Sequence, residues 1–470
     1  MRKEGVVRPQ SMSTLPSSPL AASNARIAFA MSPSTLTDET QVSELPAGVL
    51  ALILLAFLMR LPVDARLRAR EVSRGCRTLL NEPRFWTVLD FSRGSGVEAR
   101  VSRALLFAAG ERGRGHLHTL NLTGVGGLSY EHLAQFVAVH GQSLRSVTAP
   151  EGLQFSADRV TRLCRSAPLR TLRCYMGCGA ANALPLLRCE APCALLHIVK
   201  LWVHCFDNNE QVLDLAAALP SHRGKIKALT VFQAPLRNGA VANALMHRVA
   251  EARVSDFFFT NCGLAPASLS CLTRLLEDGC LERMSIRDNW RALFEEGPDL
   301  TTFCHALRSS RLQALELSRC RLWRDPAAAG ELLAALVGHP TLCELSLHYN
   351  LDADNTADVR RAAGEQLGSL ITHNSALQKL NLAGNDLGEA NLAPIFEALP
   401  RSSTLKELIF YGETISREFA RDVILPAVRA NTSLRTLDFG PYGETLPELA
   451  EAQAIVAART QPDAGAIAAA

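Results

Sequence analysis

The densest group of potential metal ligands in this 470-residue sequence lies near its centre. The group consists of Cys174, Cys178, Cys189, Cys193, His197 and His204. Thiolate and imidazole are the ligands that zinc prefers, but the close Cys-x-x-Cys pairs of a zinc ribbon are absent. Cys174 also falls where a strand should turn its side chain inward. We therefore expect packed thiols rather than a metal site, and zinc remains the alternative.

No pattern in the sequence supports a catalytic residue. The sequence contains no glycine-rich phosphate loop, no His-Glu-x-x-His motif and no convincing nucleophile elbow. His116 and His118 are close together, but nothing pairs with them. The acidic segment 354–358 lacks the glycine and the final glutamate of a calcium loop. We therefore predict a protein that is not an enzyme and that uses no cofactor or metal.

Charge and cysteine content narrow the class further. The 49 Lys and Arg residues nearly balance 46 Asp and Glu, which gives a formal net charge of +3. Such a balance predicts no general attraction to nucleic acid or to acidic membranes. The 13 cysteines are odd in number and follow no recognisable secretory signal, so we expect reduced thiols. These features favour a cytoplasmic or nuclear location, or both.

The elements that must position a binding site repeat through most of the chain. The pattern apolar-x-x-apolar-x-apolar occurs in twelve copies, at a mean spacing near 29 residues. The copies begin at Leu117, Leu144, Leu169, Leu196, Ile226, Val254, Leu281, Leu312, Leu342, Leu377, Leu405 and Leu434. Alternate apolar residues turn inward from a short strand, and the segments between copies have the apolar spacing of helices. Each copy therefore predicts one strand and one helix.

Polar residues recur eight positions after the start of several copies. They are Asn289, Cys320, Asn350 and Asn385. A buried side chain at this position would bond the backbone of the turn where the chain leaves the strand. We therefore predict that Asn385 is buried and fully bonded.

Together these features resemble the long leucine-rich repeat of the ribonuclease-inhibitor type, over roughly 350 residues. The resemblance implies an α/β fold, a curved solenoid with parallel strands inside and helices outside. We assign residues 117–440 to a solenoid of about twelve repeats. Residues 93–116 are expected to form a connecting or capping helix, and residues 441–470 a C-terminal cap and tail.

A solenoid of this kind would recognise a partner with its concave strand face. The repeat alignment places Tyr175, Trp202 and Phe232 in one column, which Arg287 continues after Thr260. A second column beside it holds Arg173, Lys200, Thr230 and Phe258. Aromatic and arginine side chains are typical of binding hot spots, so we predict that these residues, the two threonines excepted, bind a target protein. The positive charges favour a target segment with acidic or phosphorylated groups, and packing of Trp202 and Phe232 onto local loops is the alternative.

The most apolar stretch precedes the repeats. Its uncharged run, residues 47–59, has 13 residues, whereas a membrane span needs about 20. As a helix it would be apolar on all sides and would need cover from this chain or from another protein. Residues 1–42 are rich in Ser and Pro, and we expect them to be disordered, with a transit peptide as the alternative.

Residues 43–92 resemble an F-box, on their Leu-Pro start, their leucine-rich helix and the ending NEPRFWTVLDFS. Ser73 and Cys76 replace the Cys and Trp that are usual in the family. The resemblance implies docking on a Skp-type adaptor and, through it, on a cullin. The adaptor-binding residues would be Leu45, Pro46, Leu50, Ile53, Leu54 and Leu58. A helix pair that caps the following repeats is the alternative.

An F-box followed by leucine-rich repeats implies a substrate-receptor subunit of a Skp-cullin-F-box ubiquitin ligase. In this role the protein would bind the adaptor and a target, and it would make no covalent bond itself. Two alternatives stay open. One is a leucine-rich-repeat scaffold without a ligase role, and the other is a GTPase activator with a catalytic arginine at Arg112 or Arg114.

Overall fold

The structure is a computed structural model in which most residues between Trp86 and Arg459 are described. The described ranges are 86–91, 99–100, 103–123, 125–150, 153, 155–188, 196–289, 293–352, 354–440 and 446–459. All of them belong to one compact unit, Pro62–Ala470. The predicted disordered segment, the adaptor-binding residues and most of the F-box-like module lie outside the described residues.

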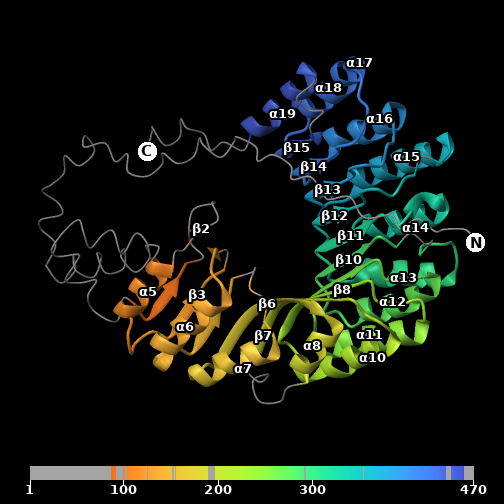
Figure 1. Cartoon of the computed structure of the whole chain (residues 1–470). Coiled ribbons are helices and arrows are strands. Elements are labelled where there is room, and N and C mark those ends of the chain that lie inside the picture. Colours follow the sequence, from red (N-terminus) through yellow and green to blue (C-terminus); the bar gives the residue numbers. More distant parts are fainter. Residues whose placement is uncertain are drawn as a thin grey trace, which may run out of the picture. The chain divides into compact units, whose positions relative to one another are not determined.

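A single parallel sheet of 13 strands runs through this unit, with the strands in chain order (Figure 1). The strands are β1 Val88–Asp90, β3 Thr119–Asn121, β5 Ser146–Thr148, β6 Thr171–Gly179, β7 Leu196–His204, β8 Ile226–Phe232, β9 Asp256–Thr260, β10 Arg283–Arg287, β11 Ala314–Ser318, β12 Glu344–Ser346, β13 Lys379–Asn381, β14 Glu407–Ile409 and β15 Thr436–Asp438. Two short strands, β2 Ala99–Arg100 and β4 Val125–Gly126, pair separately. The predicted strand of every copy is therefore present in the sheet.

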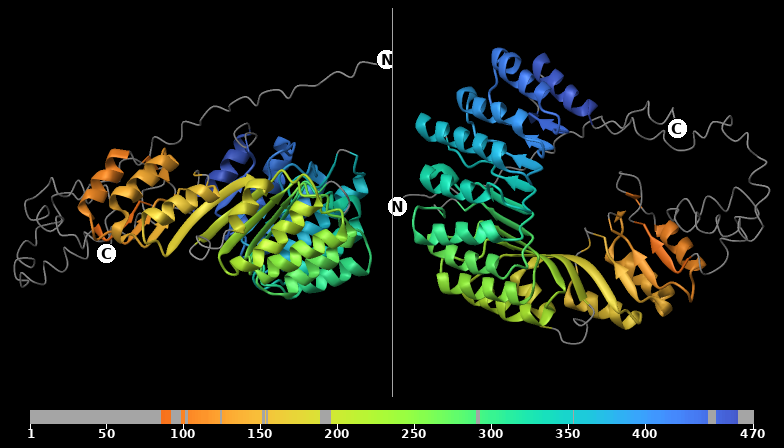
Figure 2. Two further views of the ribbon diagram at one scale, coloured as in Figure 1. Left: turned by 60° about the horizontal axis from the view of Figure 1, so that its bottom comes forward. Right: turned by 180° about the vertical axis from the view of Figure 1, so that it is seen from behind.

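Helices connect successive strands and cover the outer face of the sheet (Figure 2). The α-helices are α5 Arg103–Arg112, α6 Tyr130–His140, α7 Ala157–Ser166, α8 Ala180–Leu187, α10 Asn209–Ala218, α11 Gly239–Glu251, α12 Leu269–Glu277, α13 Pro298–Ser309, α14 Pro326–Leu336, α15 Ala357–His373, α16 Glu389–Ala398, α17 Arg417–Phe419, α18 Leu425–Ala430 and α19 Pro447–Ala458. Shorter helical turns are η4 Gly141–Ser143, η5 Leu219–His222, η6 Pro266–Ser268, η7 Leu322–Arg324, η8 Leu399–Arg401 and η9 Ala420–Ile424. The fold is the predicted α/β leucine-rich-repeat solenoid. Within the described ranges, no helix is long and apolar enough to cross a bilayer.

The buried core accounts for the apolar-x-x-apolar-x-apolar spacing of the repeat. In β11, Leu315 and Leu317 are buried, and Leu312 just before the strand is fully buried. Leu315 and Leu317 turn toward the helices because a strand alternates its side chains, whereas Glu316 between them turns to the open face. Stacking one such layer on the next buries a continuous core that no single repeat could bury alone.

The first strand of the sheet was not among the twelve predicted copies. Trp86, Leu89 and Phe91 have the same apolar-x-x-apolar-x-apolar spacing, and all three are buried. Val88–Asp90 pairs in parallel with Thr119–Asn121. The F-box resemblance assigns these residues to the end of the F-box-like module, so in this structure the repeat sheet begins inside that predicted module.

The predicted Asn ladder is confirmed. Asn385 is fully buried; its Oδ1 accepts from the backbone N–H of Asn350 at 2.8 Å, and its Nδ2 donates to the Leu382 carbonyl at 2.7 Å. The Asn350 Oδ1 accepts in the same way from the Cys320 N–H at 3.0 Å. Glu413 occupies the ladder position of a later copy, where burial raises its pKa. Each rung bonds the turn of the preceding repeat, which ties neighbouring layers together.

A second polar ladder, which the sequence analysis missed, lies at the opposite end of the strands. His339, Asn374, Ser402 and Asn431 each stand three residues before the first leucine of a copy and are buried. Each side chain accepts from the backbone N–H of that leucine, at 2.7–3.3 Å. The signal was visible in the sequence, as HPTL, NSAL, SSTL and NTSL.

Candidate binding surface on the strand face

The pairing of β7 corrects the predicted columns. The buried residues of β7 are Ile198, Leu201 and Val203, so this copy starts at Ile198 and not at Leu196. Cys174 pairs with Ile198 and Tyr175 with Lys200, which leaves Val199 as an extra, bulged residue on β7. The register between β6 and β7 therefore changes by one residue at the bulge, and Trp202 lies two residues away from the partner on β6 that the repeat alignment gives it.

The observed rows across the sheet therefore differ from the predicted ones. Trp202 pairs with Gly177 and Thr230, and the same row continues through Phe258, Ser285 and Glu316. Tyr175, Trp202 and Phe232 do not share a column, and neither do Arg173 and Lys200, because Arg173 pairs with His197. Two parts of the prediction hold, since Thr230 pairs with Phe258 and Thr260 joins Phe232 to Arg287.

The structure nevertheless brings several of these side chains together, in what we call the aromatic patch: Lys200, Trp202, Phe232 and Phe258. Trp202 is 46% exposed, and its ring meets that of Phe232 edge-on at a centroid distance of 6.3 Å. The two lie diagonally on adjacent strands, where large rings still touch. Lys200 Nζ lies 5.9 Å from the Phe258 ring centroid, within range of a cation–π interaction. Trp202 thus remains available to a partner instead of folding onto a loop.

The remaining predicted residues occupy different environments. Arg173 is exposed on β6, and nothing is described of the Tyr175 side chain. Arg287 does not belong to the aromatic patch, because its Nε forms an ion pair with Glu316 Oε1 at 2.6 Å. A cation held in this way is less available to a target than the sequence alone implied.

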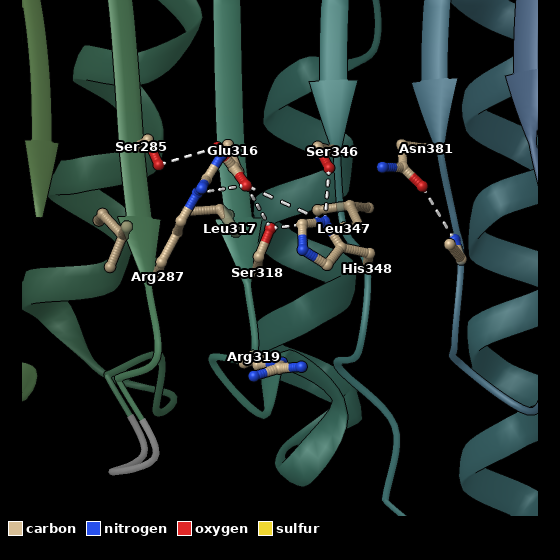
Figure 3. Close-up of polar contacts among 12 residues, drawn as sticks. Ser285, Arg287, Glu316, Leu317, Ser318, Arg319, Ser346, Leu347, His348 and Asn381 are labelled. Atoms are coloured by element: carbon tan, nitrogen blue, oxygen red, sulfur yellow. Dashed lines mark hydrogen bonds and ion pairs between the residues drawn. The ribbon is translucent and has the colours of Figure 1, made fainter. Parts of the chain in front are cut away.

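A polar cluster that the sequence analysis did not identify is centred on Glu316 (Figure 3). Ser285 Oγ donates to Glu316 Oε2 at 2.9 Å, and Ser318 Oγ donates to Oε1 at 2.8 Å. His348 Nδ1 lies 2.8 Å from Ser318 Oγ and 2.9 Å from Ser346 Oγ. These contacts join β10, β11 and the β12 turn, since the paired residues lie about 30 positions apart in the chain.

The Glu316 cluster does not have the geometry of a hydrolase triad. In such a triad the imidazole bridges a carboxylate and a hydroxyl through its two different nitrogens. Here both serine hydroxyls meet Nδ1 of His348, and Glu316 Oε1 lies 4.0 Å from the same atom. Burial lowers the pKa of His348, and Glu316 opposes this shift. The cluster therefore orders the strand face and does not form a proton relay.

An open depression of about 370 Å³ connects the two groups of residues. Its lining includes Phe258 of the aromatic patch, Arg287 and Glu316 of the polar cluster, and Lys379. Phe258 therefore belongs to both regions, and the aromatic patch continues into the depression. A partner side chain of moderate size fits such a feature better than a buried small molecule would.

The structure also bears on the zinc alternative and on Arg114. Cys174 is fully buried, as expected, and burial raises its pKa to about 12, which opposes the thiolate that zinc requires. Cys189 and Cys193 lie outside the described residues. Among the residues that are described, no group of three or more His, Cys, Asp or Glu side chains could hold a metal ion. Arg114, one of the two candidate catalytic arginines, is exposed. Its Nη1 forms an ion pair with Glu111 Oε2 at 3.7 Å.

Comparison with known proteins agrees with the repeat architecture. No protein-family profile matches the chain. It is 27% identical over 181 residues to human NACHT, LRR and PYD domains-containing protein 5, over 34% of this chain and 15% of that protein. It is 26% identical over 205 residues to the ribonuclease inhibitor of Sus scrofa, over 38% of this chain and 43% of the inhibitor. The chain thus spans less than half the length of these relatives.

Solved structures with similar folds include the leucine-rich-repeat-containing protein LegL7 from Legionella pneumophila. That similarity has a TM-score of 0.36 at 13% identity and covers 73% of this chain and 97% of LegL7. The yeast complex of Rad7 and Elc1 gives a TM-score of 0.41 at 13% identity, over 65% of this chain and 74% of the matched chain. The sequence relatives and the 13-stranded sheet together show a solenoid like that of ribonuclease inhibitor.

Proposed function

We propose that this protein recognises a target protein on its strand face, with Trp202 as the central anchor. The observation that carries the proposal is the 46% exposure of Trp202 on a sheet whose other large apolar side chains are mostly buried. Phe232 and Phe258 flank it, and the depression beside Phe258 offers room for a target side chain. Exposed aromatic rings that cluster in this way are characteristic of interface hot spots.

We further propose that recognition serves a Skp-cullin-F-box ubiquitin ligase, in which the chain is the substrate receptor. The support is the resemblance of residues 43–92 to an F-box. Almost all of these residues lie outside the described ranges. In this role the protein catalyses no step itself and raises the effective concentration of target lysines near the conjugating enzyme. The expected location is the cytoplasm, the nucleus or both.

Alanine substitution tests the recognition step. Trp202→Ala should weaken capture of a target by about 2 kcal/mol, roughly 30-fold in Kd. Leu213 is a matched control, because it is 42% exposed but lies on the outer helix α10. Targets identified by affinity purification with the full chain would be titrated against both variants. Equal affinities for the Trp202→Ala and Leu213→Ala variants would contradict a role for the strand face.

Adaptor binding is tested separately. The double change Ile53→Asp and Leu54→Asp should abolish co-purification of a Skp-type adaptor, because each would desolvate an unpaired carboxylate. Target capture through Trp202 should persist in this variant. If the wild-type chain captures its target but never an adaptor, the protein is a scaffold without a ligase role.

A further inference from the structure

The two halves of the strand face treat their positive charges differently. The three cations within strands β10 to β14 are neutralised within the sheet, whereas Lys406, directly before β14, hydrogen-bonds to Gln378. Arg283 Nη2 lies 2.6 Å from Glu344 Oε2, Arg287 Nε lies 2.6 Å from Glu316, and Lys379 Nζ lies 2.7 Å from Glu407 Oε1. Because each of the three strand cations already has a carboxylate, the strands of this half offer little net charge to a partner.

The half of the strand face formed by β5 to β8 has the opposite character. We call it the cationic half, because it carries five exposed cations. They are Arg145, Arg170, Arg173, Lys200 and Lys227. Arg145 and Arg170 directly precede β5 and β6, and the other three lie within β6, β7 and β8. No ion pair joins any of them to a carboxylate in the described part of the chain.

The sequence of these four strands explains the imbalance. None of β5, β6, β7 and β8 contains an Asp or a Glu. The first carboxyl group beyond them on the sheet is Asp256 of β9, which is 7% exposed. Burial raises the pKa of Asp256, although Lys227 and Arg283 oppose that shift, so its negative charge is disfavoured. The cationic half therefore has no internal counter-charge of its own.

His197 lies beside one of these cations. It pairs with Arg173 across β6 and β7. Burial lowers the pKa of His197 first, and Arg173 and Lys225 lower it further. Cations that disfavour a proton on a neighbouring imidazole would favour an anion at the same place.

We propose that the cationic half binds an extended acidic segment of the target protein, with an apolar side chain of that segment on Trp202. This inference rests on the proposed function and specifies the chemistry of the target. From β5 to β8 the face spans three strand spacings, about 14 Å, which an extended segment crosses with about four or five residues. Carboxylate and phosphate groups both suit guanidinium groups, which bind either one with two hydrogen bonds.

Synthetic probes test the proposal directly. A fluorescent twelve-residue peptide that alternates Glu with Gly around one central Leu would be titrated against the full chain. Parallel titrations would use the same peptide with Lys in place of Glu, with two phosphoserines, and a twelve-nucleotide oligouridine. We expect the acidic peptides to bind. The affinity of the phosphoserine peptide, compared with that of the Glu peptide, shows whether phosphate binds as tightly as carboxylate or more tightly. The Lys peptide should not bind.

The decisive comparison removes two positive charges from the cationic half and, in a control variant, two from the outer helices. Arg173→Gln with Lys200→Gln should weaken binding of the acidic peptide at least 10-fold and should reduce its salt dependence. Arg248→Gln with Arg429→Gln removes the same net charge from the outer helices α11 and α18, where both arginines are also ion-paired, and a change of less than 3-fold is expected. Thermal unfolding confirms that both variants fold. Equal losses in the two variants, or oligouridine binding as tight as that of the acidic peptide, would overturn the proposal.

Target capture separates the failure of this inference from failure of the proposed function. If Trp202→Ala weakens capture of a purified target but the Arg173 and Lys200 double variant does not, the strand face binds targets of another chemistry. If neither variant weakens capture, the strand face is not the target site at all.

Discussion

At the scale of single residues, the buried polar ladders are the most consequential feature of this protein. Asn385 makes four side-chain hydrogen bonds to backbone groups of two adjacent repeats. Asn385→Leu would leave those buried groups unsatisfied and should lower the free energy of unfolding by about 1–3 kcal/mol. Urea unfolding followed by circular dichroism measures this loss. Gln313→Leu, a change at an exposed position, should leave stability nearly unchanged.

His339 predicts how stability should depend on pH. Its Nδ1 accepts from the backbone N–H of Leu342 at 3.1 Å, and its Nε2 lies 3.0 Å from the Leu307 carbonyl and 3.2 Å from Ser310 Oγ. Burial lowers the pKa of His339 below its ordinary 6.5, so the folded state holds the neutral ring. Its contribution is therefore complete above about pH 6.5 and is lost as the pH falls toward the lowered folded value.

The matched variant for this test is His339→Asn, because Asn374 and Asn431 fill the same ladder position in other repeats. Melting temperatures between pH 7.5 and 5 should fall less steeply for the variant than for the wild type. The variant retains some pH dependence from His222, whose pKa burial also lowers. If the melting temperatures of the two proteins fall equally steeply with pH, the protonation of His339 does not change on unfolding.

At the scale of elements, the close approach of α15 and α16 depends on two glycines. A side chain at Gly364 would collide with the Asn391 carbonyl, and a Cβ at Gly368 would lie 2.7 Å from the Pro394 carbonyl. Backbone atoms cannot move aside cheaply, so Gly364→Ala should separate the helices and destabilise the protein by about 1–3 kcal/mol. Gly239→Ala in α11 is the control, because nothing lies within 4 Å of its new Cβ. An equal melting temperature for both variants would argue against tight packing of α15 on α16.

At the scale of the whole molecule, β1 is the first strand of the sheet and covers the edge of β3. A chain shortened to begin at Val97 would lose the buried side chains of Trp86 and Leu89 and would expose that edge. Burial of a large apolar side chain contributes about 2 kcal/mol, and exposed edges promote aggregation. We expect a lower melting temperature and larger particles in gel filtration than for a chain that begins at Pro62. If the two shortened chains behave alike, β1 contributes little to the solenoid.

The sequence alone determined the solenoid and its Asn ladder. Both follow from a local period, because the residues that define one strand, one turn and one ladder position lie within about ten positions of each other. The same logic would have identified β1 and the second ladder, since Trp86 to Phe91 and the four-residue stretches that begin at His339 and Asn374 repeat the pattern. The sequence analysis did not predict β1, because its residues were assigned to the F-box-like module. It did not predict the second ladder, because that repeated pattern was not recognised.

Only the tertiary structure decided which outward side chains are neighbours and which cations are free. The bulge at Val199 is invisible in a repeat alignment, because an extra residue is recognised only when adjacent strands pair. The observed pairing places Trp202 beside Gly177 and not beside Tyr175, while the diagonal contact with Phe232 keeps the two rings together. Likewise, Arg283 and Glu344 are 61 positions apart and meet across the small side chain of Ala314, which pairs with both of them on the strand between. Register and charge pairing across strands depend on contacts distant in sequence, which a local period does not encode.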